Sequence, residues 1–184
     1  RDENDIIKER VAKHYRLKEI DERLRSSRTR AESRLLREAR RAGVYVPQIT
    51  DESKFSIKME LIDGMKVRDC INKKNFAEIC EKIGESVALL HGFGIIHGDL
   101  TTSNMILKKN KLYLIDFGLG FHSQRIEDKA VDIKLLKDVL RSTHFDIYED
   151  AWKIILKAYE KYEQSDKVIK TLEHIEKRAR YKER

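Results

Sequence analysis

The chain has 184 residues, which limits it to one domain or to one domain with two lobes. Hydrophobic residues make up 40% of it, enough for a buried core, and the 39% of charged residues predicts charged surfaces and long helices. No apolar run approaches the roughly 18 residues of a membrane span, and no signal peptide is recognisable, so we expect a cytoplasmic protein with no membrane contact.

The first third of the chain is predicted to alternate between strands and one long helix. Gly43 follows the helical pattern, where a left-handed residue commonly ends a helix. Pro47 marks the strand after it as an edge strand or an irregular one. The expected elements are a strand at 5–13, a helix at 21–42, and strands at 44–49 and 55–62, with turn residues at 50–54.

Beyond Asp63 and Gly64 the pattern becomes mostly helical. Asn75 and Glu78 are spaced as a variant of the capping box, with an apolar helical face after them. The expected elements are that helix, strands at 104–109 and 111–117 joined by a turn at 109–110, and helices at 127–142, 146–163 and from 165 onward. We therefore expect a strand-rich lobe at 1–63 and a helical lobe at 64–184.

Three acceptor side chains lie near this junction, in "HGDLTTSN" (97–104) and "IDFG" (115–118). A hairpin of the two strands would bring Asn104 close to Asp116, and Asp99 lies on the same loop as Asn104. Alone, each residue is more simply a turn or cap residue, and His97 is more simply a loop-orienting residue than a base. Together, one amide and two carboxylates suit Mg²⁺, which commonly also binds phosphates, so a nucleotide is the economical ligand.

This arrangement resembles the catalytic and metal-binding segments of the protein-kinase-like fold. The resemblance implies an α+β, two-lobed fold. It also implies that Lys8 contacts the nucleotide phosphates and that Glu32 pairs with Lys8. By the same match, Met59 is the gatekeeper behind the adenine, and Glu60 and Ile62 offer it a backbone acceptor and a backbone donor.

Several positions depart from the common kinase pattern. Gly98 replaces the arginine that reads an activating phosphate, and Thr101 replaces a lysine that contacts the transferred phosphate. Almost no activation loop separates Gly118 from Glu127, and no A-P-E follows. Asp132 either bonds the backbone of the catalytic loop or is a helix-surface residue. The missing lysine, and the little room that the short helical lobe after Asp116 leaves for docking a peptide, favour water over a peptide hydroxyl as the nucleophile.

"HGDLTTSNMIL", "IDFGLG" and "EDKAVD" closely resemble the small atypical kinase/ATPase subunit of the KEOPS complex, the PRPK-like family. The resemblance implies ATP and Mg²⁺ as cofactors, and as partners the threonylcarbamoyl transferase subunit, the other small KEOPS subunits and tRNA. In some archaea the transferase is fused to this family. Only seven residues precede Lys8, so the family's phosphate-covering loop is expected to be missing from this sequence or to be disordered.

The sequence thus predicts an atypical serine/threonine kinase or ATPase that supports threonylcarbamoyladenosine synthesis on tRNA. Lys8 and Glu32 would position the phosphates, Asn104 and Asp116 would hold Mg²⁺, and Asp99 would orient the nucleophile or accept its proton. Two alternatives stay open. One is a serine/threonine kinase that acts on a soluble protein, and the other is a non-catalytic basic scaffold that binds tRNA and a partner.

The carboxyl end is basic, and the chain as a whole has a net charge of +7. Such a charge suits an anionic partner, although ordinary solubility explains it equally well. Read alone, the end is a solvated helix terminus, whereas the family resemblance favours contacts with tRNA phosphates. The candidate residues are Lys177, Arg178, Arg180, Lys182 and Arg184, with Tyr181 among them to stack on an unpaired base.

Overall fold

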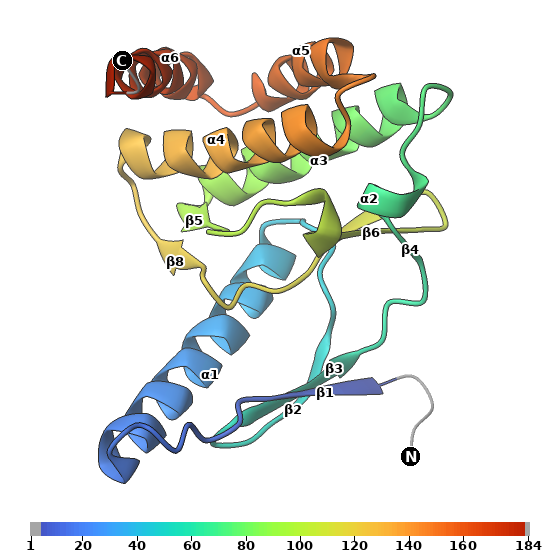
Figure 1. The fold of residues 1–184 in the computed structure, drawn as a ribbon. Helices are drawn as coiled ribbons and strands as arrows, with labels where there is room; N and C mark the ends of the chain where they lie inside the picture. The colour runs from blue at the N-terminus through green and yellow to red at the C-terminus, as the bar shows by residue number, and fades with distance from the viewer. Residues whose placement is uncertain (1–4, 183–184) are drawn as a thin grey trace.

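The computed structural model describes residues 5–182, and side chains for residues 5–178. A strand-rich amino-terminal part is followed by a mostly helical remainder, so the α+β prediction is confirmed (Figure 1). The strands are β1 (Asp5–Glu9), β2 (Ile49–Glu52), β3 (Ser56–Glu60), β4 (Met65–Lys66), β5 (Ile95–Ile96), β6 (Met105–Lys108), β7 (Lys111–Leu114) and β8 (Phe121–His122). The helices are α1 (Lys18–Arg41), α2 (Val67–Cys70), α3 (Phe76–Gly92), the 3₁₀ turn η1 (Thr102–Asn104), α4 (Ile126–Thr143), α5 (Tyr148–Tyr159) and α6 (Ser165–Lys182).

The amino-terminal part is an antiparallel sheet in the order β1-β3-β2 with one long helix, α1. Apolar residues at helical spacing, Leu35, Leu36 and Ala39, bury one face of α1 in the core. Gly43 follows the helix with a φ of +90°, as its position in the sequence predicted. Figure 1 shows α1 running from the sheet toward the helical part, so its carboxyl half lies near the junction.

The strand expected at 44–49 is wrong. Val44 and Val46 are buried, but the ladder with β3 begins only at Ile49, which pairs with Met59. Part of the segment bonds elsewhere, because the carbonyl of Tyr45 accepts a hydrogen bond from Leu114 N at 2.9 Å. Of the residues expected as a turn at 50–54, residues 50–52 instead belong to β2. The strand expected at 5–13 is also shorter, since the ladder of β1 ends at Glu9.

The hairpin of β6 and β7 forms as predicted. Lys109 and Asn110 both have positive φ, at 46° and 62°, as a two-residue turn that matches the twist of the strands requires. Ile115 N donates to the carbonyl of Asn104 at 3.0 Å, just past the paired ends of the strands. The hairpin therefore brings the segments that carry Asn104 and Asp116 side by side.

The helical part is packed around α3 and α5. A side chain at Gly84 of α3 would overlap the backbone of α5 at Ile155, so glycine permits this close approach. Asn75 precedes α3, but its side chain bonds the preceding loop: it accepts from Asn72 N at 2.8 Å and donates to the carbonyl of Cys70 at 3.0 Å. The capping box predicted at Asn75 is therefore wrong, although the start of the helix was right.

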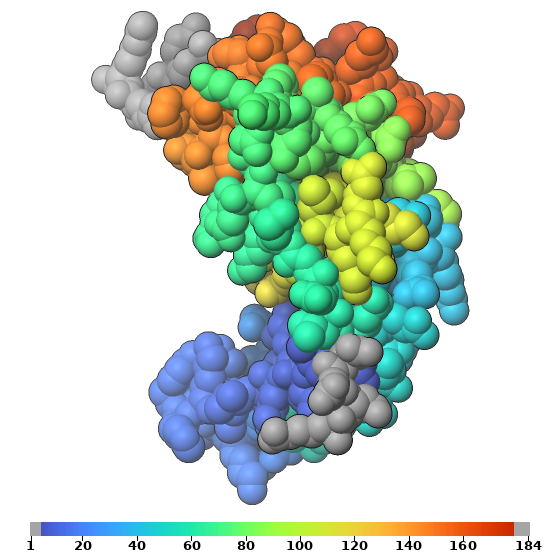
Figure 2. Space-filling view, turned by 90° about the vertical axis from the view of Figure 1, so that its right-hand side faces the viewer, coloured from blue at the N-terminus to red at the C-terminus, as the bar shows by residue number. Residues whose placement is uncertain are grey.

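The space-filling view places the sheet and the amino-terminal half of α1 below the helical part, with a notch in the surface between them (Figure 2). Cys70 and Cys80 are free thiols. Among the described residues, no helix combines the length and the apolar character needed to cross a bilayer.

Candidate active site

The candidate residues come from five separate elements. Lys8 is on β1, Glu32 on α1, and Asp116 is the second residue after β7. Asp99 lies on the loop after β5, and Asn104 ends η1. Backbone pairing at the end of the β6–β7 hairpin and ion pairs from Lys8 bring them to one region, at the junction of the sheet and the helical part.

Lys8 is bound to two carboxylates. Its Nζ lies 2.6 Å from Glu32 Oε1 and 2.6 Å from Asp116 Oδ1. The contact with Glu32 is the pair that the kinase resemblance implied. The contact with Asp116 joins the strand lysine to the expected metal ligand, so the two predicted halves of the site meet at this ammonium group.

The carboxylate of Asp116 is held in its ionised form. Partial burial would raise its pKa, but the hydrogen bond and the charge of Lys8 and the N–H of Gly118 lower it below its usual range. The backbone of Asp116 has a φ of 63°, which is uncommon for a residue other than glycine. A charged carboxylate on a constrained backbone is suited to bind a cation.

Asp99 and Asn104 form a second pair. The amide nitrogen of Asn104 donates to Asp99 Oδ2 at 2.7 Å and to the Asp99 carbonyl at 3.0 Å. The amide oxygen of Asn104 is the atom that could bind a metal. Asn104 thus fixes its own loop, as the plainer interpretation of the sequence held, and leaves this oxygen as its acceptor.

His97 is a loop-orienting residue. Asp99 N donates to its Nδ1 at 3.2 Å, so the proton of the neutral ring lies on Nε2, which donates to the carbonyl of Ile115 at 3.1 Å. Burial lowers the pKa of His97, although several carboxylates oppose the shift. The ring therefore links the loop of Asp99 to Ile115, the residue between β7 and Asp116.

Asp132 bonds the backbone of the loop that carries Asp99, as the first of its two interpretations held, and is not a helix-surface residue. Its oxygens accept from His97 N and Gly98 N, both at 2.9 Å. Behind it, His91 Nε2 lies 3.3 Å from Asp132 Oδ2, and His91 Nδ1 lies 2.8 Å from the hydroxyl of Tyr159. Burial lowers the pKa of His91 despite the nearby carboxylate. The loop thus rests on a buried hydrogen-bonded chain.

Two further contacts of the site were not predicted. His144 Nε2 lies 3.1 Å from the buried hydroxyl of Thr102, which holds the same loop at a second point. Arg10 donates to Glu32 Oε2 at 2.6 Å. Alternation along the strand expected at 5–13 could have indicated Arg10, since residues two apart face the same side of a strand. For His144 the sequence offers no signal, because its partner is 42 residues away.

Gly98 is required where it stands. Its φ is +77°, and a side chain there would overlap the carbonyl oxygen of Leu119. The short segment after Gly118 packs on the loop at this point, and its strand β8 pairs with β5. The arginine of ordinary kinases has no space at this position, which explains its replacement.

The residues expected to bind adenine lie at the end of β3. Met59 and Ile62 are each 6% exposed, so both belong to the core. The N–H of Glu60 is used within the structure, where it donates to the carbonyl of Gln48 at 2.8 Å. This bond leaves the carbonyl of Glu60, the expected acceptor, untouched. The adenine contacts stay a prediction.

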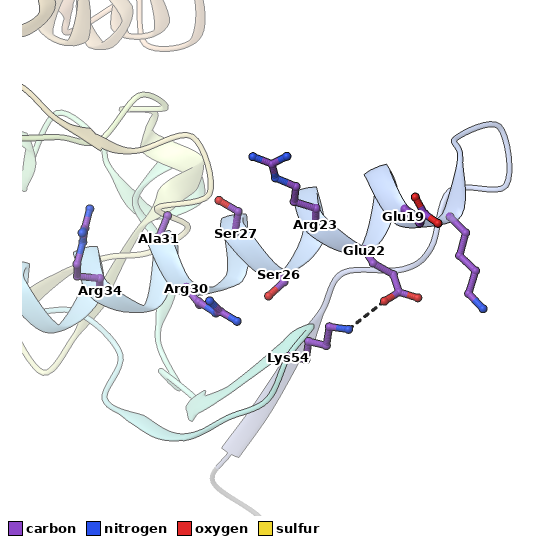
Figure 3. A pocket seen from close by; sticks show the side chains of 10 residues that line it. Glu19, Glu22, Arg23, Ser26, Ser27, Arg30, Ala31, Arg34 and Lys54 are labelled. Carbon is purple, nitrogen blue, oxygen red and sulfur yellow. Dashed lines mark hydrogen bonds and ion pairs between the residues drawn. The ribbon is translucent and has the colours of Figure 1, made fainter.

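A hollow of about 910 Å³ lies along α1, away from these groups (Figure 3). Its lining includes exposed arginines, and Lys54 closes one side with an ion pair to Glu22 at 2.9 Å. The lining residues are Lys18, Glu19, Glu22, Arg23, Ser26, Ser27, Arg30, Ala31, Arg34 and Lys54. None of the candidate site residues is among them, so this hollow is not the candidate active site.

The donor set fits magnesium bound together with phosphates. Within residues 5–178 no three histidine, cysteine or acidic side chains gather as a metal cluster. Asn104 and Asp116 offer one amide and one carboxylate oxygen, and Mg²⁺ commonly takes its other ligands from water and from phosphates. The two residues therefore suit a metal that arrives with a nucleotide.

The basic carboxyl end lies on α6. Lys177 and Arg178 are exposed on that helix. The side chains of Arg180 and Lys182, and the whole of Arg184, lie outside the described residues. The expected contact with tRNA stays a prediction.

The fold and the paired lysine and glutamate beside two metal-type acceptors define a protein-kinase-like class. A family model of the RIO domain matches residues 3–139, and the chain belongs to that family. The chain is 42% identical over 187 residues to the KEOPS complex subunit Bud32 of Pyrococcus abyssi (strain GE5 / Orsay), with 97% of this chain and 85% of that protein covered. The expected membership in the KEOPS kinase-subunit family is confirmed.

A longer relative and a solved structure complete the comparison. The chain is 46% identical over 181 residues to a probable bifunctional tRNA threonylcarbamoyladenosine biosynthesis protein of Methanosarcina acetivorans, with 96% of this chain and 31% of that protein covered. It spans about a third of the length of such bifunctional relatives. The Rio2 kinase-ADP/Mg²⁺-phosphoaspartate complex from Chaetomium thermophilum matches at a TM-score of 0.63 and 19% identity, covering 95% of this chain and 60% of that one, which shows the shared fold.

Proposed function

We propose that this chain is the Mg·ATP-dependent kinase or ATPase component of a KEOPS assembly that makes threonylcarbamoyladenosine on tRNA. The observation that carries the proposal is the position of Lys8, 2.6 Å from both Glu32 and Asp116. This ammonium group can exchange the carboxylate of Asp116 for a phosphate while it keeps Glu32. The ADP and Mg²⁺ in the printed title of the Rio2 neighbour support the choice of nucleotide.

Each residue then has a role in phosphoryl transfer. Lys8, held by Glu32, positions the α and β phosphates, and Asp116 and Asn104 hold Mg²⁺, which neutralises charge on the transferred phosphoryl group. Asp99 orients the nucleophile or accepts its proton. Met59, Glu60 and Ile62 border the adenine. In this proposal residues 1–63 form the smaller lobe and residues 64–184 the larger one.

Water is favoured as the nucleophile. The segment after Gly118 is short and packs on the catalytic loop at Gly98, so a peptide-docking platform like that of ordinary kinases has little room. Thr101 also lacks the charge of the usual lysine. Water would attack the γ phosphorus and lose a proton toward Asp99, and ADP would leave. Autophosphorylation remains compatible with this site.

The partners follow from the relatives. Bud32 of Pyrococcus abyssi is named as a KEOPS subunit, and the longer relatives are named as bifunctional tRNA threonylcarbamoyladenosine biosynthesis proteins. These names support the transferase subunit, in a complex or on the same chain, together with the other KEOPS subunits and tRNA. A cytoplasmic location is part of the same proposal.

Phosphate release tests the proposal. The purified chain is assayed with Mg·ATP alone, with the transferase subunit, and with that subunit plus tRNA, and radiolabelled ATP reports transfer to protein. We expect release that rises when partner and tRNA are present. Label transferred mainly to an added protein would favour a serine/threonine kinase, and tRNA binding without any release would favour a scaffold.

A further inference from the structure

The carboxylate of Glu32 is shared between two cations. Lys8 Nζ lies 2.6 Å from Oε1, and an Nη of Arg10 lies 2.6 Å from Oε2. The side chain of Glu32 is only 2% exposed, and that of Arg10 is 19% exposed. Each oxygen of a buried carboxylate therefore has its own cation, one from β1 and one from the residue directly after that strand.

Arg10 is itself fixed to α1. Its carbonyl oxygen accepts a hydrogen bond from Arg25 Nη1 at 3.2 Å, and Arg25 pairs with the buried Asp21 at 2.7 Å. The guanidinium of Arg25 also lies 3.9 Å from the ring centroid of Phe55. Arg10 is thus bound to α1 through its backbone at one turn and through its side chain at another, so its guanidinium has a defined position.

Glu32 is not the only anion that Lys8 binds. The same ammonium group contacts Asp116, and in the proposed function it contacts phosphates. A buried carboxylate that loses its partner is strongly destabilising, because the uncompensated charge stays in a poorly solvated place. If Lys8 were the only cation at Glu32, movement of Lys8 toward a ligand would release the helix.

We propose that Arg10 is a positioning residue that keeps Glu32, and with it α1, in place whichever anion Lys8 binds. The inference rests on the proposed function for its consequence in catalysis, but its structural content is independent of ATP. The helix position is then set by the strand β1 itself and needs neither nucleotide nor an activating phosphate. In this division Arg10 holds the helix and Lys8 serves the ligand.

Amide hydrogen exchange of α1 without nucleotide tests the structural content. Lys8→Met should leave the exchange of residues 28–36 near that of the parent protein, because Arg10 still pairs with Glu32. Lys8→Met with Arg10→Met should exchange about ten- to a hundredfold faster there, the factor expected for losing a hydrogen bond to a charged group. Equal exchange in the single and double variants would overturn the proposal.

Arg37 supplies a matched control. It also joins α1 to the sheet, through an ion pair with Glu52 at 3.0 Å, but it lies five residues beyond Glu32 on the helix, does not pair with Glu32, and is half exposed. Lys8→Met with Arg37→Met should keep the slow exchange of residues 28–36. Fast exchange in this control as well would overturn the specific role of Arg10, because any link between helix and sheet would then suffice.

Steady-state kinetics test the consequence. Arg10→Met should lower kcat about tenfold with a smaller change in KM, and Arg10→Lys should recover most of the loss, since a lysine can still donate to Oε2. Unchanged kcat in a folded Arg10→Met protein, or no recovery with lysine, would overturn this consequence. A parent protein without ATPase activity would contradict the proposed function alone, because the exchange experiment does not use ATP.

Discussion

The loop of Asp99 and the cluster around Lys8 are held by different kinds of interaction. Asp132, His97 and Thr102 fix the loop through hydrogen bonds from groups that are at most 2% exposed. The carboxylate of Asp116 is half exposed, and Lys8 holds it through an ion pair. The first region can change only if buried polar groups lose their partners, whereas the second can exchange one ion for another.

This difference separates the tasks of the two regions. Unpaired buried polar groups are costly, so the loop is expected to have one geometry with or without a ligand. Ion pairs at a partly exposed site are weak and exchangeable, so a phosphate or a metal can replace them at little cost. The loop would set the geometry of the reaction, and the cluster would respond to the nucleotide.

The largest effect is expected from Asp99→Ala. The side chain of Asp99 accepts a hydrogen bond from Asn104 and is only partly buried. The variant should therefore fold and should bind Mg·ATP nearly as before. Turnover should fall about 10²–10⁴-fold, the usual contribution of a positioned base. Phosphate release and nucleotide affinity measured on the same preparation test this. An equal loss of nucleotide affinity would mean that Asp99 binds the nucleotide as the residues around Lys8 do. The contrast between the loop and the Lys8 cluster would then fail.

Asp132→Ala should show what the buried support contributes. Removing a carboxylate that accepts from His97 N and Gly98 N leaves buried donors unpaired, so unfolding should become easier by about 3 kcal/mol. Asp138→Ala on the same helix is the control. It removes a partly exposed pair with Lys134 and should cost less than about 1 kcal/mol. Urea unfolding measures both, and equal losses would contradict the buried role.

Acid should act on the loop first. Burial lowers the folded-state pKa of His91 and of His97, so the unfolded chain binds protons that the folded protein refuses. The stability from these neutral rings is present above the unfolded pKa of about 6.5 and is lost as pH falls below it. We expect unfolding free energy to decrease between pH 7 and 5. His174→Gln, at an exposed position, should keep that slope, whereas His91→Gln should flatten it.

The Lys8 cluster should respond only at lower pH. Lys8 holds the pKa of Asp116 below its usual range, so the stability of this pair is present above about pH 4 and is lost as pH falls through the folded-state pKa. Carboxyl titration by carbon NMR should show Asp116 titrating at higher pH in Lys8→Met than in the parent. An unchanged titration would mean that Lys8 and Asp116 are not paired in solution.

The smallest effect on the two regions should come from deleting residues 177–184, which lie outside both. Mg·ATP binding should stay intact. The affinity for tRNA, measured with the partner subunit present, should fall, and its dependence on salt should flatten, because fewer phosphates are neutralised. If the affinity for tRNA and its dependence on salt did not change, the carboxyl end would have no role in tRNA binding.

The sequence predicted the part of the site whose residues lie close together along the chain. Asn104 and Asp116 meet because a short hairpin with a recognisable turn joins them, and Asp99 lies on the same loop. The pairing of Lys8 with Glu32 came from resemblance, since neither residue alone is unusual in a strand or a helix. Their roles stay predictions.

The features that the sequence did not predict depend on contacts between residues far apart in the chain, or on a competing local partner. The segment of Val44 and Val46 has the alternation of a strand, but its backbone bonds a distant hairpin, which no local pattern records. Arg10 and His144 are ordinary residues until the fold supplies their partners. At Asn75 a nearby loop offered better partners than the helix did.

The crowding at Gly98 constrains how such a chain can evolve. A single mutation to arginine would place a side chain on a left-handed backbone and against the carbonyl of Leu119. A chain with this packing therefore cannot accommodate arginine at position 98 by that one change alone. The segment from Gly118 to Gly120 would first have to be rebuilt, so an engineered phosphate-reading arginine must begin with this segment rather than with position 98.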